Sequence, residues 1–161
     1  MGVGAELMIS YKAGYKYQLT KTYQVTVFIY PAKPVETKYL SLSTDGLLTI
    51  RDGYAWDGPS GPTIDSKNFI ITSLPHDAIY QLIRMDLLGR SCKELADRLL
   101  RRMFVSTWIE AHPKPTSWFK RGVYNTRLTT VKVRAWYVWR AVQWFGKDAA
   151  FGREKPVLTA P

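Results

Sequence analysis

Residues 52–62, Asp-Gly-Tyr-Ala-Trp-Asp-Gly-Pro-Ser-Gly-Pro, divide this chain into two parts with different hydrophobic periods. Before them, apolar and polar residues alternate, most clearly from Tyr23 to Tyr30, and this alternation predicts antiparallel strands. After them, apolar residues recur every three or four positions, which predicts helices. Because glycine permits torsion angles closed to other residues and proline fixes its own, residues 52–62 are expected to form a shaped loop rather than a flexible one.

The strand pattern continues after a break between Pro31 and Pro34. It resumes over 37–43, and Thr44-Asp45-Gly46 is typical of a turn that leads into a further strand over 47–51. The first part of the chain is therefore expected to form a β-meander or a small antiparallel sheet.

The first predicted helix begins at a cap formed by Asp65 or Ser66 and runs to about Leu88. Pro75 lies inside it and is expected to interrupt it, because proline lacks the amide that an α-helix needs. Gly89 suits the end of this helix.

Two more helices follow. Ser91 and Glu94 have the spacing of a capping box, so a second helix should begin there and end before Pro113. A third is predicted over 118–145. The order of sheet, loop and three helices predicts an α+β fold, with a core domain over 1–112, a basic aromatic helix within 113–147 that packs on this domain or extends from it, and a surface tail over 148–161.

The composition favours one folded unit without disulfides. The chain has 161 residues, of which 46% are hydrophobic, and a single cysteine, Cys92, which excludes an intramolecular disulfide framework. No apolar run approaches the roughly 20 residues of a membrane span, and the N-terminus lacks the basic-then-apolar pattern of a signal peptide. We expect a protein made in a cytoplasm, with no signal peptide and no transmembrane segment.

Positive charge is concentrated in one segment. The formal net charge is +10, and residues 113–147 contain eight lysines and arginines but no aspartate or glutamate. A segment of one sign favours an anionic partner, such as phospholipid headgroups, nucleic acid or an acidic protein surface. The alternative is a face that only keeps the protein soluble.

A candidate pair of catalytic residues lies on the first two helices. His76 and Tyr80 are four residues apart and share one helix face, whereas Asp77 points about 100° away, toward the glycine-rich loop. On the second helix Asp97 shares a face with Leu100, which directs its carboxylate inward. If the two helices are antiparallel, Asp97 reaches the ring of His76.

Such a pair has two interpretations. A carboxylate bound to one ring nitrogen fixes the tautomer of the histidine and leaves the other nitrogen free to accept a proton from water, which is half of a hydrolase. Alternatively, the pair is a satisfied hydrogen bond that only joins two helices. The sequence leaves both open.

The loop adds a possible metal site. Asp77 offers a carboxylate, and the loop from Tyr54 onward can turn backbone carbonyls toward it, with Tyr54, Trp56 and Gly58 as the expected donors. Hard oxygen donors of this kind suit calcium, which would polarise an ester carbonyl. The chain has no thiolate cluster and no paired histidines, so zinc is less suited.

Taken together, Tyr-x-x-x-Gly-Pro at 54–59, His-Asp-x-x-Tyr at 76–80 and Ala96-Asp97 resemble the core of phospholipase A2, especially the disulfide-free version in parvovirus capsid proteins. The resemblance implies that His76 is the general base and that Asp77 binds calcium together with loop carbonyls. It also implies that Asp97 orients the histidine with help from Tyr80.

A wider pattern, from Gly53-Tyr54-Ala55-Trp56-Asp57-Gly58-Pro59-Ser60 through His76-Asp77 to Ala96-Asp97-Arg98, is similar to an uncharacterised domain family of tailed phages and prophages. This resemblance covers about 47–103. It implies a viral protein that is made in the host cytoplasm and becomes part of the virion.

The third helix carries a basic aromatic surface. Its core stripe is expected at Val131, Ala135, Val138 and Val142, spaced by four, three and four. The candidate surface residues are Lys132, Arg134, Trp136, Trp139, Arg140 and Trp144. They suit an anionic bilayer, docking on other virion subunits, or a homo-oligomer, and the tryptophans alternatively complete the core. Nucleic acid ranks last, because no nucleic-acid-binding signature is present.

These observations lead to two hypotheses. The first is a phage-type, calcium-dependent phospholipid ester hydrolase that uses a His-Asp dyad. The second is a non-catalytic component of the phage tail, baseplate or neck, in which the same pair is structural.

Overall fold

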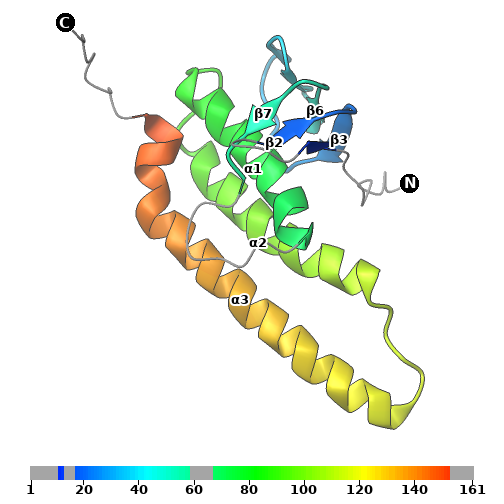
Figure 1. The fold of residues 1–161 in the computed structure, drawn as a ribbon. Helices are drawn as coiled ribbons and strands as arrows, with labels where there is room; N and C mark the ends of the chain where they lie inside the picture. The colour runs from blue at the N-terminus through cyan, green and yellow to red at the C-terminus, as the bar shows by residue number, and fades with distance from the viewer. Residues whose placement is uncertain (1–10, 13–16, 59–66, 153–161) are drawn as a thin grey trace, which may run out of the picture.

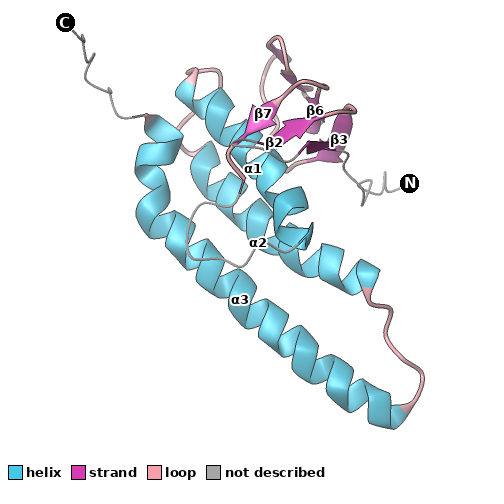
Figure 2. Ribbon diagram, viewed as in Figure 1, coloured by secondary structure: helices cyan, strands magenta, loops and turns pink. Residues whose placement is uncertain are grey.

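A computed structural model describes residues 11–12, 17–58 and 67–152, and its fold is α+β, as the sequence predicts (Figure 1). Strands come first and helices follow (Figure 2). The strands are β1 (Tyr11–Lys12), β2 (Tyr17–Leu19), β3 (Tyr23–Thr26), β4 (Val35–Glu36), β5 (Leu40–Leu42), β6 (Leu47–Ile50) and β7 (Ala55–Trp56). The helices are α1 (Lys67–Arg84), α2 (Cys92–Ala111) and α3 (Trp118–Phe151).

The described strands form two antiparallel sheets. One has the order β3-β6-β5-β4 and contains the predicted meander, with the turn before β6 made by Gly46 at a φ of +85°. The predicted strand over 23–30 is paired only as far as Thr26, although its side chains remain alternately buried and exposed to Tyr30. The other sheet has the order β1-β2-β7. Strand β7 comes from the stretch predicted as a loop, and its pairing with β2 holds that stretch against the body of the fold.

Helix α1 differs from its prediction in two ways. It runs without a break through Pro75, so the expected interruption is wrong. Proline removes only one backbone hydrogen bond, and the buried neighbours Leu74 and Ala78 hold this part of the helix in the core. The helix also ends at Arg84 instead of near Leu88, because Asp86 adopts a left-handed φ of 55°. The predicted caps at Asp65 and Ser66 lie outside the described residues.

Helix α2 has the predicted extent, but the capping box is wrong. Ser91 has helical torsion angles and makes no side-chain cap, and Glu94 pairs instead with Arg98 one turn later. Helix α3 continues six residues beyond the predicted end, to Phe151. The first residues of the predicted surface tail are therefore helical, and Ala150 is buried.

The three helices pack side by side, and α2 and α3 form a hairpin whose connecting turn lies far from the sheets (Figure 1). The inward face of α3 has buried or half-buried residues at alternating spacings of four and three: Tyr124, Leu128, Val131, Ala135, Val138 and Val142. This confirms the predicted core stripe, which meets Leu100 and Phe104 of α2. None of the described helices combines the length and apolar character needed to cross a membrane.

Candidate active site

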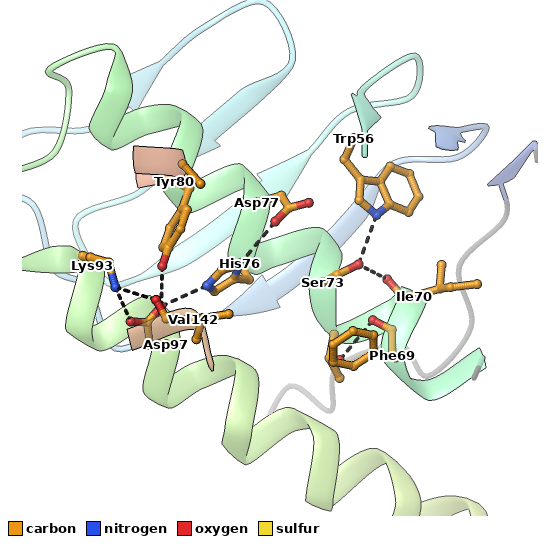
Figure 3. A network of polar contacts seen from close by, with 12 residues as sticks. Trp56, Phe69, Ile70, Ser73, His76, Asp77, Tyr80, Lys93, Asp97 and Val142 are labelled. Carbon is orange, nitrogen blue, oxygen red and sulfur yellow. Dashed lines mark hydrogen bonds and ion pairs between the residues drawn. The ribbon is translucent and has the colours of Figure 1, made fainter. Parts of the chain in front are cut away.

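His76 lies between two carboxylates, one on each ring nitrogen (Figure 3). Its Nε2 is 3.0 Å from Oδ1 of Asp97, and its Nδ1 is 3.3 Å from Oδ1 of Asp77. The predicted approach of Asp97 to the ring is confirmed, and the cause is the antiparallel packing of α1 and α2. The imidazole therefore joins an acid on the neighbouring helix to an acid on its own helix.

Asp97 is an unusually well satisfied buried carboxylate. It is 0% exposed, and besides His76 it accepts hydrogen bonds from Tyr80 Oη at 2.6 Å, Lys93 Nζ at 2.7 Å and Gln143 Nε2 at 3.1 Å. Burial alone would raise the pKa of Asp97, but the hydrogen bonds from His76, Lys93 and Tyr80 outweigh it and hold the pKa below its usual value. Asp97 is therefore a permanent negative charge at neutral pH.

Helix α3 closes this side of the site. Gln143 reaches Asp97 from α3, and Lys93 donates a second hydrogen bond to the Val142 carbonyl at 3.1 Å. A Cβ on Gly146 would lie only 2.7 Å from Oη of Tyr80, so α3 approaches the site as closely as a glycine allows. The hydrogen-bond network around His76 and Asp97 thus involves three helices, α1, α2 and α3.

Three residues of the site were not predicted from the sequence: Lys93, Gln143 and Gly146. Lys93 could have been found, because it precedes Asp97 by four residues and therefore shares its helix face. Gln143 and Gly146 carry no comparable signal, since their role depends on how α3 packs.

The ring of His76 is held tightly. His76 is 5% exposed, and its ring centroid is 4.1 Å from that of Tyr80. Burial alone would lower the pKa of His76, but the hydrogen bonds to Asp77 and Asp97 outweigh burial and raise the pKa above the usual value. Burial, reinforced by the hydrogen bond to Asp97, raises the pKa of Tyr80, so its hydroxyl remains a donor.

A pocket of about 450 Å³ opens on the Asp77 side of the site, and its lining includes Asp77 and Tyr80 but not His76. The Asp77 side chain, which is 28% exposed, lies on its wall. The lining residues are Tyr54, Ala55, Trp56, Asp57, Asp77, Tyr80, Gln81, Arg84, Met85 and Ala149. The prediction that Asp77 faces the glycine-rich loop of residues 52–62 is confirmed for its described part, because Asp77 and residues 54–57 line the same pocket.

Of the three residues expected to offer carbonyl oxygens to calcium, Tyr54 and Trp56 lie on the pocket and Gly58 does not. Tyr54 and Trp56 line the pocket, but the Tyr54 carbonyl already accepts the Leu19 amide at 2.8 Å. The indole of Trp56 donates to Ser73 Oγ at 3.2 Å, which ties β7 to α1 (Figure 3). Gly58 is packed against the ring of Tyr17 and is not among the lining residues.

A second carboxylate, Asp57, also lines the pocket, and the sequence analysis did not choose it. Burial, together with the charges of Asp77 and Asp57, raises the pKa of the Tyr54 hydroxyl, which places both carboxylates in its electrostatic range. The donors are hard oxygens, which are the kind that calcium prefers, so the donor type fits this ion. Within the described residues no group of three or more acidic, histidine or cysteine side chains is arranged to hold a metal ion, so a calcium site here would need backbone or water oxygens as well.

The predicted surface residues of α3 divide into two groups. Lys132, Trp136 and Trp144 are exposed. Arg134 and Trp139 turn toward α2: Arg134 lies over the ring of Phe104, and the ring of Trp139 lies 5.2 Å from the Arg101 guanidinium. Arg140 is half-buried among three tryptophans and lies closest to Trp144, at 4.9 Å.

Comparison with protein families, curated proteins and solved structures finds no match to this chain. The chemistry of the site is therefore the basis for a functional assignment.

Proposed function

We propose that this protein is a hydrolase that cleaves carboxylic esters, with phospholipids as the substrate class, and that His76 is its general base. The observation that carries this proposal is the 3.0 Å contact between His76 Nε2 and Asp97, beside a pocket that holds Asp77. General-base catalysis requires a histidine that is oriented by a buried acid and close to the substrate, and the neighbour of His76, Asp77, lies on the wall of the pocket.

The reaction follows from the two ring nitrogens. Because Asp97 accepts the proton on Nε2, the neutral ring presents an unprotonated Nδ1 toward Asp77, which lines the pocket. Water attacks the ester carbonyl and transfers a proton to Nδ1, and the imidazolium then returns this proton to the leaving alkoxide. Asp97 stabilises the imidazolium, while Tyr80 and Lys93 hold Asp97 in place.

Calcium bound by Asp77, with Asp57 and loop oxygens, would supply polarisation of the ester carbonyl. Asp77 lies 3.3 Å from Nδ1 and favours the protonated ring, which is the wrong state for a base. A cation that shares the charge of Asp77 counters this effect. The proposal therefore requires activity to depend on calcium.

A second candidate function is supported by the closure of the site. His76 is 5% exposed, and Asp97 accepts hydrogen bonds from three other side chains, as in a network that only joins helices. In that case the protein is a non-catalytic component of a phage tail, baseplate or neck. Its presence in intact particles at fixed stoichiometry, together with absence of hydrolysis, would favour this function.

The deciding experiment measures fatty acid release from phospholipid vesicles with calcium and with a chelator. We expect calcium-dependent release that His76→Ala reduces by roughly 10²–10⁴-fold. The matched control is His112→Ala, because His112 is the other histidine of the chain and lies exposed at the end of α2. The catalytic role would be refuted if folded His76→Ala released fatty acid as fast as the wild type, or if the wild type released none.

A further inference from the structure

Helix α3 is apolar on two opposite faces. Its inner face packs on α2, yet its outer face exposes large hydrophobic side chains along its length. Phe119, Val133, Tyr137 and Trp144 are exposed, and their separations of fourteen, four and seven residues are close to whole turns of a helix. They therefore share one face, the outer stripe, with Trp136 beside it, and exposed Thr126 and Thr130 separate Phe119 from the other three residues on this face.

Cations flank this stripe on both sides. Exposed Lys120 and Arg127 are seven residues apart, close to two turns, and form one row. Arg121 and Lys132 are eleven residues apart, close to three turns, and form a row on the other side. An apolar stripe between two cationic rows is the pattern of a helix that lies flat in the headgroup region of a bilayer.

We propose that the outer face of α3 is the surface with which this protein binds an anionic lipid bilayer. The face is complementary to such a surface in charge, because residues 113–147 contain eight basic and no acidic side chains. Over residues 113–147 a second copy of the chain would present the same positive charge and no acid to pair with it, so self-association through this part of α3 is disfavoured. The exposed aromatic stripe has no use in binding a phosphate backbone, which disfavours duplex nucleic acid.

This face also has a position relative to the pocket. Trp144 of the outer stripe precedes Ala149 by five residues, less than two helical turns, and Ala149 lines the pocket together with half-exposed Met85. At the other end of α3, Trp118 and Phe119 are exposed at the turn of the hairpin (Figure 1). A bilayer along α3 would thus extend from the hairpin turn to the edge of the pocket. The inference extends the proposed function, but the binding does not require the dyad to be active.

The test is co-sedimentation of the full chain with phosphatidylglycerol vesicles and with phosphatidylcholine vesicles. We expect binding to the anionic vesicles that weakens with salt. Neutralising Lys120, Arg127 and Lys132 to glutamine should weaken binding roughly a hundredfold, because each cation near an anionic surface strengthens binding roughly fivefold. The matched control neutralises Lys21, Lys33 and Lys38, which are exposed on the strand side of the molecule, and should bind like the wild type.

Aromatic residues are tested in the same assay. The double variant Trp136→Ala, Trp144→Ala should bind roughly tenfold more weakly. Phe28→Ala with Tyr30→Ala is the control, since those side chains are 47% and 62% exposed, against 49% and 65% for the two tryptophans. Circular dichroism checks that each variant is folded.

Several results would overturn the inference: no binding of the wild type to anionic vesicles, equal losses in both control variants, a dimer that the tryptophan variant disperses, or salt-sensitive binding to DNA in place of vesicles. Binding by His76→Ala without fatty acid release supports the inference. Binding by the wild type without release supports the inference while refuting the proposed function, so the two failures are distinguishable.

Discussion

The two sides of His76 differ in nearly every physical respect. On the Nε2 side, Asp97 is fully buried, and a lysine, a tyrosine and a glutamine donate to it. On the Nδ1 side, Asp77 is partly exposed on the wall of a pocket. A carboxylate without water must be satisfied by the protein, whereas one at a pocket can exchange partners. The Asp97 side is therefore built for stability, and the Asp77 side is the one to which the proposed function assigns substrate and ion.

Asp97→Ala tests the difference between the two sides and is expected to have the largest effect on the free energy of unfolding. It leaves the buried Lys93 ammonium without its carboxylate, so we expect a loss of about 3–5 kcal/mol in the free energy of unfolding. Asp77→Ala, the matched change on the open side, should cost less than about 1 kcal/mol. Urea denaturation measures both. Equal losses in the two variants would mean that the two sides of the histidine do not differ as described.

A smaller effect is expected at the contact between α3 and the dyad. Gly146→Ala places a methyl group 2.7 Å from Tyr80 Oη, so we expect a loss of about 1–3 kcal/mol. Gly122→Ala is the control in the same helix, because a Cβ there meets nothing within 4 Å. It should stabilise the protein by about 0.5–1 kcal/mol. Thermal denaturation that shows stabilisation by both variants would contradict the close packing of α3 on Tyr80.

The pH dependence of the free energy of unfolding reports on Asp97, the carboxylate on the buried Nε2 side of His76. Because the pKa of Asp97 is lower in the folded protein than in the unfolded chain, Asp97 stabilises the fold above the usual carboxyl value of about 4. This contribution is lost as the pH falls through the folded value. The difference in unfolding free energy between wild type and Asp97→Asn should therefore shrink below about pH 4. The decrease is about 1.4 kcal/mol for each pH unit by which folding lowers the pKa of Asp97. A difference that is constant from pH 7 to acid would contradict an ionised Asp97.

The smallest effect concerns the wall of the open side. Trp56→Phe removes the indole hydrogen bond to Ser73 but keeps an aromatic ring, so we expect a loss of about 0.5–1.5 kcal/mol. A double-mutant cycle with Ser73→Ala isolates this bond, because both single variants remove the same interaction. Strictly additive losses would show that the bond does not hold β7 on α1.

Much of the fold could be predicted because its signals are local. Alternation identified β3 and β6, and the spacing of Val131, Ala135 and Val138 identified the inner face of α3. The errors occurred where packing overrides a local rule. Pro75 stays inside a helix because its neighbours are buried, and Ser91 does not cap α2 although its spacing to Glu94 suits a capping box.

Part of the candidate site could also be predicted, because some of its residues carry local signals in the sequence. His76 and Asp97 carry helix-face signals that predicted their contact, whereas the contact of Tyr80 with Asp97 was implied by the resemblance to phospholipase A2. Asp57 was missed because its place on the pocket depends on the pairing of β7 with β2. Gly58, chosen as a donor, is instead packed on Tyr17.

The sequence by itself determined the order of sheet and helices, the inward faces of those helices and the concentration of positive charge in 113–147, because periodicity and charge are properties of neighbouring residues. Only the tertiary structure decided that α3 completes the dyad through Gln143 and that the pocket lies on the Asp77 side. Both depend on contacts between segments distant along the chain, and the free energy of such contacts is set by how whole helices pack.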